Sequence, residues 1–301
     1  SLRLDFERFC SESNIEYQNI QRAAIKAHTD KIVTTNATGV ATNSIDYYKA
    51  FHELDNYAFD YYPSLRDVEI SSFPYAHARG VCNKDFWLLE FQSGGGHGLW
   101  GSGRLQPYPG ALRQAAIHAF AAGADLVAHF QFRTFPFGAE QLNYAVVDID
   151  GIPRRRFYEV QAAARDLKKL GGILKNSRFD NEVALCFDYE ALWALKIKPI
   201  AKDFNYLKFC SEIYQQLIKL GAGVDVVSFN HDLHKYKVVI VPAPIIMSDE
   251  FKRRLKHYVY NGGVLLSTFL AGIKNPDNLG IVQSLPCGMT DVFGIRVGEV
   301  E

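Results

Sequence analysis

The sequence predicts an α/β protein, and three observations support this fold class. Short apolar segments rich in β-branched and aromatic residues alternate with helical patterns along the whole chain. Strands that are apolar on both faces are typical of a parallel sheet covered by helices. The first half supplies four such strands, preceded by a helix that has no strand of its own. Because a (β/α)8 barrel needs eight strands, residues 1–176 are predicted to form the C-terminal half of a TIM barrel.

The elements of the first half follow from side-chain spacing and from terminating residues. Residues 5–28 carry an apolar stripe at helical spacing, which only Ser13 interrupts. The helix predicted over 154–171 ends in basic residues and is closed by Gly171. A polar connector is expected between residues 64 and 84. The stripe consists of Phe6, Phe9, Tyr17, Ile20 and Ala24. The predicted strands are 31–36, 57–63, 85–91 and 125–132, and the other predicted helices are 44–54 and 110–124.

The second half repeats the alternation with different spacing and predicts a doubly wound domain over residues 180–301, of flavodoxin or amidotransferase type. Segment 173–181 is the expected linker. Ser248 is a good helix start because Asp249 and Glu250 follow it in the first turn. The predicted strands are 182–189, 224–229, 236–244 and 263–270, and the predicted helices are 206–222 and 248–262.

Composition limits the partners and the compartment. Lys+Arg and Asp+Glu number 33 each, so no net charge would recruit nucleic acid or an anionic membrane surface. No apolar stretch approaches the roughly 18 residues that a membrane-spanning helix needs. The five cysteines form no Cys-x-x-Cys pair, which is typical of reduced thiols. We therefore expect a cytoplasmic protein that binds neither nucleic acid nor membranes.

Glu90 is the first candidate for chemistry, because it stands near the C-terminal end of the apolar strand 85–91. In a parallel barrel, catalytic side chains lie at the C-terminal ends of the strands. A solvated acid at a strand end fits the spacing equally well. Neighbouring strand ends favour the catalytic interpretation, since polar and aromatic groups that converge on one rim suit a sugar. These groups are Asn36, Asp60, Tyr61, Tyr62, Gln131 and Arg133.

The glycine cluster after Glu90 matches the letter pattern of a nucleotide-binding motif but not its structural context. Residues 96–101, GHGLWG, fit the dinucleotide pattern and follow a strand. That motif requires a helix to begin within it, whereas Pro107 and Pro109 come before any helix here. We therefore expect no nucleotide cofactor, and instead a loop that carries Trp100 over a strand-end carboxylate.

The second domain shows no chemistry of its own. An amidotransferase would need a cysteine at a sharp turn from strand to helix, whereas Cys186 and Cys210 fall inside a strand and a helix. His231 and His234 have His-x-x-His spacing, but no cysteine or third histidine lies nearby in the sequence. This pattern indicates a surface turn rather than a metal site, and no metal is expected.

Several segments resemble glycoside hydrolase family 42, the bacterial β-galactosidases. They include DFWLLEFQSG, GALRQAAIHAFAAGADLVAHFQFRTFPFGAEQ and DGIPRRRFYEVQAAARDL. The second half, from EVALCFDYEALWAL to FGIRVGEVE, is similar to the middle domain that mediates trimerisation in that family. The resemblance implies a retaining glycoside hydrolase that acts on terminal β-D-galactosides, uses no cofactor and assembles as a homotrimer through its second domain.

The resemblance also assigns site residues. It implies that Glu90 is the catalytic nucleophile and that the acid/base glutamate would lie upstream of Ser1, so that this chain is a fragment with little activity alone. The family's histidine after Glu140 is replaced by Asn143 or Tyr144, a change that affects galactose selection. Phe91-Gln92 and Tyr61 also depart from the family pattern. The implied substrate-binding residues are Tyr62, Trp100, Phe137, Glu140 and Asn143.

Other functions fit parts of the sequence. The site could hydrolyse a related glycoside, such as an α-L-arabinopyranoside or a β-fucoside. The chain could also be a non-catalytic module for sugar binding and oligomerisation. A nucleotide-dependent oxidoreductase is the third alternative, and it rests on the glycine motif alone.

Overall fold

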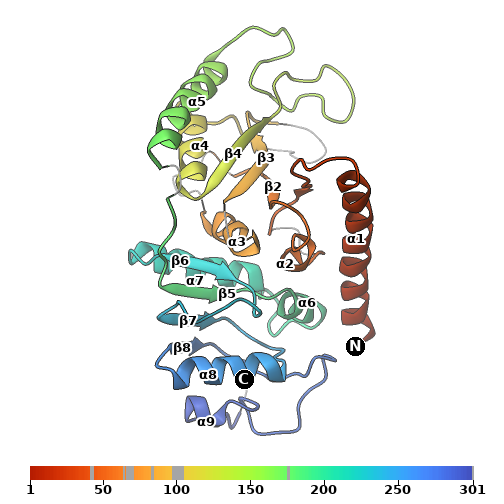
Figure 1. Cartoon of the computed structure of the whole chain (residues 1–301), viewed down its shortest axis with the longest axis vertical. Coiled ribbons are helices and arrows are strands. Elements are labelled where there is room, and N and C mark those ends of the chain that lie inside the picture. Colours follow the sequence, from red (N-terminus) through yellow and green to blue (C-terminus); the bar gives the residue numbers. More distant parts are fainter. Residues whose placement is uncertain are drawn as a thin grey trace. The chain divides into compact units, whose positions relative to one another are not determined.

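The computed structural model describes residues 1–40, 44–63, 65, 71–82, 85–96, 105–174 and 177–299. It is an α/β structure with two parallel four-stranded sheets (Figure 1), which confirms the predicted fold class. The contacts divide the chain into two compact units. We call Ile32–Gly39 with Leu54–Arg178 the site unit, and Ser1–Lys31 with Val40–Glu53 and Phe179–Glu301 the C-terminal unit.

The sheet of the site unit runs β1-β2-β3-β4 in the order of the chain, and all neighbours are parallel. Parallel strands place their C-terminal ends at the same edge, so Asn36, Asp60 and Glu90 share one edge of this sheet. The strands are β1 (Asn36–Ala37), β2 (Ala58–Tyr61), β3 (Phe86–Gln92) and β4 (Ala124–Phe130). The helices of this unit are α3 (Phe73–Cys82), α4 (Ala111–Ala121) and α5 (Arg155–Leu174).

The core of the site unit is aromatic. Tyr75 stacks on Phe86 with ring centroids 5.7 Å apart, and Phe86 contacts Phe59 at 5.6 Å. Tyr75 comes from α3, which lies in the segment expected to be a polar connector. The same helix buries His77 completely, and burial lowers the pKa of His77 to about 3. Helix α3 is thus part of the core that supports β2 and β3.

The C-terminal unit contains the second parallel sheet, in the order β6-β5-β7-β8. The rings of Phe229 and Phe251 stack at 4.0 Å in its core. The Ser248 hydroxyl accepts a hydrogen bond from the Phe251 amide at 3.1 Å, which confirms the predicted helix start. The strands are β5 (Val183–Cys186), β6 (Val224–Val227), β7 (Val238–Val241) and β8 (Val264–Ser267). The helices are α6 (Tyr189–Ile197), α7 (Tyr206–Lys219), α8 (Asp249–Tyr260) and α9 (Thr290–Phe293).

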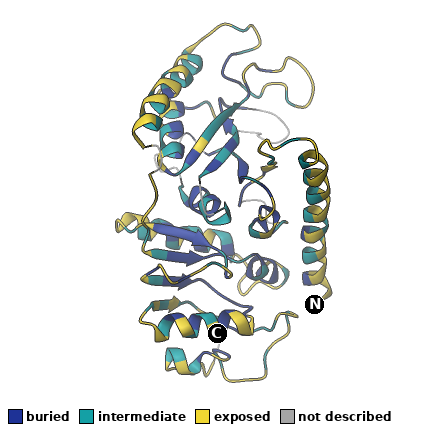
Figure 2. Cartoon of the chain, in the orientation of Figure 1, coloured by how far each residue is buried: buried dark blue, intermediate teal, exposed yellow. Residues whose placement is uncertain are grey.

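Helices α1 (Leu2–Lys26) and α2 (Tyr47–Ala50) also belong to the C-terminal unit, although the sequence groups them with the barrel segment. Arg8 on α1 donates to Glu190 on α6 at 2.9 Å, and Tyr47 on α2 contacts Tyr189 with ring centroids 6.1 Å apart. These polar and aromatic contacts join elements that are far apart in the sequence. The outer surface of α1 is exposed over most of its length (Figure 2).

None of the helices in the described ranges is long and apolar enough to cross a membrane.

Candidate active site

The C-terminal edge of the first sheet brings Glu90 and Tyr62 together. Glu90 is half-buried near the end of β3, and Tyr62 directly follows β2. The Tyr62 hydroxyl donates a hydrogen bond to Oε2 of Glu90 at 2.6 Å. This short bond fixes one of the two carboxylate oxygens of Glu90. The two residues expected at the centre of the site therefore form one hydrogen-bonded pair.

A second carboxyl group lies beside this pair. Asp60 is the register partner of Glu90 across the β2–β3 ladder, and the Asn36 side-chain amide donates to Oδ2 of Asp60 at 2.8 Å. Burial raises the pKa of Asp60 to about 6, the Asn36 hydrogen bond opposes this shift, and the nearby Glu90 charge adds to it. The strand ends thus form a polar row across β1, β2 and β3.

The glycines after Glu90 allow a close approach of two backbone segments. The Tyr144 amide donates to the Gly95 carbonyl at 2.9 Å, and Gly96 pairs with Asn143. A side chain at Gly94 would place its Cβ 2.9 Å from the Cβ of Tyr144 and closer still to the Tyr144 carbonyl oxygen. Gly94 and Gly96 are therefore required for packing rather than for flexibility.

Glu140 and Asn143 lie on the segment that packs against these glycines. The Asn143 side-chain amide donates to the Glu140 carboxylate. Phe137 is 77% exposed. Within the described ranges, no hydrogen bond joins Glu140 or Asn143 to Glu90. Trp100, the remaining predicted site residue, lies outside the described residues, as do residues 97–104.

A buried side-chain amide contacts the glycine segment that follows Glu90. The Gln92 side chain is 4% exposed and donates to the Gly94 carbonyl at 3.0 Å. His129 on β4 lies 3.3 Å from the Gln92 carbonyl oxygen, and burial lowers its pKa. Gln92 was noted in the sequence only as a departure from the family pattern, because nothing in one strand reveals which loop its side chain reaches.

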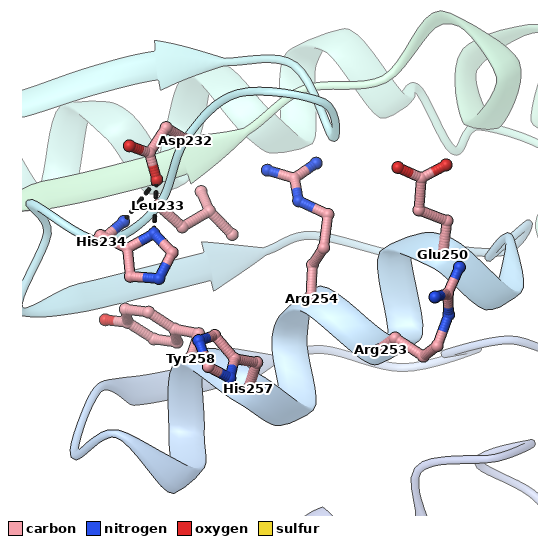
Figure 3. Close-up of a pocket in the computed structure, with 8 residues that line it drawn as sticks. All are labelled: Asp232, Leu233, His234, Glu250, Arg253, Arg254, His257 and Tyr258. Carbon is pink, nitrogen blue, oxygen red and sulfur yellow. Dashed lines mark hydrogen bonds and ion pairs between the residues drawn. The ribbon is translucent and has the colours of Figure 1, made fainter.

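The His-x-x-His segment of the C-terminal unit lies on a surface turn beside α8. Nδ1 of His234 is hydrogen-bonded to the Asp232 carboxylate at 2.6 Å, and the His234 ring contacts His257 with ring centroids 5.5 Å apart (Figure 3). These residues line a pocket of about 270 Å³ (Figure 3). In the part of the chain that the structure describes, no group of three or more His, Cys, Asp or Glu side chains could hold a metal ion.

Two cysteines of the C-terminal unit lack the properties of nucleophiles. All five are free thiols. Cys186 and Cys210 are fully buried, and burial raises the pKa of the Cys186 thiol to about 12. A thiol that stays protonated is a poor nucleophile, so Cys186 is not a candidate nucleophile.

Comparison with known proteins identifies similar sequences over the whole chain. The family model for glycoside hydrolase family 42, described as β-galactosidase, matches residues 1–170, and the model for the β-galactosidase trimerisation domain matches residues 181–301. The β-galactosidase BgaA of Clostridium cellulovorans is 31% identical over 307 residues, which cover 100% of this chain and 46% of that protein. BgaH of Haloferax lucentense is 32% identical and covers 99% of this chain and 46% of its own length.

Solved structures give the same result. The β-galactosidase of Bacillus circulans sp. alkalophilus superposes with a TM-score of 0.90 at 32% identity, over 96% of this chain and 43% of its own. Gan42B, also a family 42 β-galactosidase, superposes with a TM-score of 0.92 at 28% identity, over 99% and 46%. The chain thus spans about half the length of the relatives that it matches, and the resemblance noted in the sequence is confirmed.

Proposed function

Because the chain belongs to glycoside hydrolase family 42, the β-galactosidases, we propose that it forms part of a retaining glycosidase that hydrolyses terminal non-reducing β-D-galactosides. The observation that carries this proposal is the Glu90 carboxylate, which is held by the Tyr62 hydroxyl at the C-terminal edge of a parallel sheet. In this proposal residues 1–176 are the C-terminal half of a TIM barrel. Residues 180–301 are a doubly wound domain, which the strand order β6-β5-β7-β8 supports.

Glu90 is the proposed nucleophile. Its carboxylate attacks the anomeric carbon, and the bond to the leaving oxygen breaks as that oxygen receives a proton. Water then releases the sugar from the ester. Retaining enzymes place the proton donor about 5–5.5 Å from the nucleophile. We propose that this second carboxyl group comes from the half of the protein that the chain does not span.

Tyr62 would assist both halves of the reaction. The hydrogen bond from its hydroxyl to Glu90 stabilises the carboxylate before attack, and it stabilises the same negative charge when the ester is cleaved.

The proposed sugar contacts are Tyr62, Trp100, Phe137, Glu140 and Asn143. An exposed aromatic side chain such as Phe137 can pack against a sugar ring. The Asn143–Glu140 hydrogen bond fixes both side chains, so that together they offer amide and carboxylate groups to sugar hydroxyls. Because Asn143 or Tyr144 stands where the family has a histidine, a related pyranoside that differs around O4 or O6 is the second candidate substrate.

We further propose that the C-terminal unit mediates a homotrimer in the cytoplasm. The match to a trimerisation domain supports the assembly, and the free thiols support a reducing compartment.

The test is a Glu90→Gln variant in a full-length protein that contains this chain. We expect turnover of nitrophenyl β-galactoside to fall by at least about 1,000-fold, and no covalent adduct to form with a 2-fluoro galactoside. Glu159→Gln, on α5 of the same unit, is the matched control. It should retain both turnover and formation of the covalent adduct. Undiminished turnover by Glu90→Gln would refute the assignment. A panel of nitrophenyl glycosides then separates galactosides from arabinopyranosides and fucosides.

A further inference from the structure

The ladder between β2 and β3 places two carboxyl groups side by side. Asp60 and Glu90 are register partners on neighbouring parallel strands. Register partners point to the same face of a sheet, and adjacent strands lie about 4.8 Å apart. Asp60 is also joined to a third strand, because it accepts the Asn36 amide at 2.8 Å. Neither the comparisons nor the proposed mechanism gives Asp60 a role.

We propose that Asp60 is a positioning residue for the nucleophile, which holds the Glu90 carboxylate in place together with Tyr62. This inference rests on the proposed function, in which Glu90 is the group that attacks. It extends that function by adding a third residue that sets the geometry and charge of the nucleophile.

The two neighbours act on Glu90 with opposite effect. Tyr62 attracts one carboxylate oxygen through a hydrogen bond of 2.6 Å. Asp60 repels the same carboxylate whenever both groups are charged. Attraction on one side and repulsion on the other favour a single orientation, in which Glu90 leans towards Tyr62. A nucleophile held in one orientation needs less reorganisation to reach the anomeric carbon.

The contacts of Asp60 show that it acts through other residues. Its Oδ2 is occupied by the Asn36 amide, and its Oδ1 is buried and accepts no hydrogen bond from the described residues. These contacts connect Asp60 to Asn36 and, through the ladder, to Glu90, so we assign it a positioning role rather than a catalytic one.

The charge of Asp60 should change in the opposite sense to the charge of Glu90 during the reaction. Burial places the pKa of Asp60 at about 6, with Glu90 raising it and Asn36 lowering it. When Glu90 forms the ester bond to the sugar, its negative charge disappears and the repulsion on Asp60 ends. Asp60 then releases a proton to water more readily. When the ester is cleaved, Glu90 regains its charge and Asp60 regains a proton from water.

The experiment measures the titration of Asp60 in the 301-residue chain, with aspartate labelled by ¹³C at the carboxyl carbon. The Asp60 signal is identified by sequential assignment and by its loss in Asp60→Asn. We expect Glu90→Gln to lower the midpoint of Asp60 by roughly 0.3 to 1 unit, because a like charge is removed. Asn36→Ala should raise the midpoint, because a donor to the carboxylate is removed. Glu159→Gln is the matched control and should leave it unchanged.

An unchanged Asp60 midpoint in Glu90→Gln would overturn the inference, because the two carboxyl groups would then not interact. This experiment distinguishes failure of the positioning role from failure of the proposed function. If Glu90→Gln abolishes turnover in the full-length protein but leaves Asp60 unmoved, the positioning role fails and the hydrolase assignment stands. If Glu90→Gln turns over normally, the hydrolase assignment fails whatever Asp60 does. Because the Glu90→Gln variant retains Asp60, the measurement of its midpoint does not require Asp60→Asn to fold.

Kinetics of Asp60→Asn in the full-length protein provide a second readout. Since Asp60 acts on the nucleophile, kcat should fall by about 10-fold while KM changes little, and the acid limb of the pH profile should move. A rise in KM with kcat unchanged would contradict the positioning role and indicate a direct substrate contact.

Discussion

The stability of the site unit should depend on pH through His77. This residue lies on α3, is fully buried, and its ring meets Tyr57 edge-on at 6.4 Å. Burial lowers its pKa to about 3, compared with about 6.5 in an unfolded chain. Between these two values the unfolded chain binds a proton that the folded unit does not bind. The stability due to neutral His77 is therefore complete above about pH 6.5 and is lost as the pH falls towards 3.

The size of this effect follows from the two pKa values. Lowering the pH from 7.5 to 5.5 should cost the wild-type unit about 1.4 kcal/mol through His77, and a further decrease to 4.5 about 1.3 kcal/mol more. His77→Gln lacks this slope. The stability of the wild type relative to that of the variant should thus fall by about 1.4 kcal/mol between pH 7.5 and 5.5. Asp60, whose raised pKa has the opposite effect, is present in both proteins and cancels.

Hydrogen exchange measures this difference without interference from the C-terminal unit. Peptides from β2 and β3 report the opening free energy of the site unit at each pH. His52→Gln, which alters a histidine side chain that is 81% exposed, is the control and should follow the wild type. If wild type and His77→Gln lost stability in parallel as the pH falls, His77 would not be held neutral by burial, and the reasoning would be wrong.

Two further substitutions test the site directly. Tyr62→Phe removes the donor to Glu90, and because a hydrogen bond to a charged group is worth about 1.5–3 kcal/mol, kcat of the full-length protein should fall by about 10- to 100-fold. Tyr158→Phe, which alters an exposed tyrosine on α5, is the control. Equal activity in the two variants would show that Tyr62 does not assist the nucleophile. Gly94→Ala forces the new Cβ into the backbone of Tyr144, so thermal unfolding of the site unit should shift downwards by several degrees, which corresponds to about 1–3 kcal/mol. Gly171→Ala, where a Cβ meets nothing within 4 Å, should be neutral or stabilising, and the same shift in both variants would argue against close packing at Gly94.

The sequence predicts the alternation of strands and helices well, because each segment carries its own spacing. It predicts the extent of β1 poorly. Residues 31–36 have the composition of a strand, yet only Asn36–Ala37 pair with β2. Before them, the Val33 amide donates to the Asp55 carboxylate at 2.7 Å and the Thr34 hydroxyl donates to the Asn56 carbonyl at 2.8 Å. Side-chain hydrogen bonds and one backbone bond, from the Asp55 amide to the Val33 carbonyl at 3.1 Å, hold this segment in place of a ladder.

Helices that are apolar on all sides also escape prediction. Helix α6 buries most of its residues, Trp193 and Leu195 among them, so it shows no stripe that separates a buried face from an exposed one. Helix α1 shows the opposite case. Its stripe predicts the helix correctly, but Phe6 and Phe9 are each 64% exposed, whereas Leu4 and Ser11 are the buried positions. Spacing identifies a helix, and tertiary contacts such as Arg8 with Glu190 decide which face is covered.

The same limit applies to the site. Parallel strands end at one edge, so the sequence could place Tyr62 and Glu90 on the same rim without knowing the register. The alignment of Asp60 with Glu90 could not be predicted. Phe59 pairs with Leu88, and a regular ladder would pair Asp60 with Leu89, yet the register shifts after Phe59 and Asp60 pairs with Glu90 instead. Since side chains alternate between the faces of a sheet, this shift of one residue sets two carboxyl groups next to each other. The irregularity involves both strands at once, and therefore neither strand's sequence reveals it.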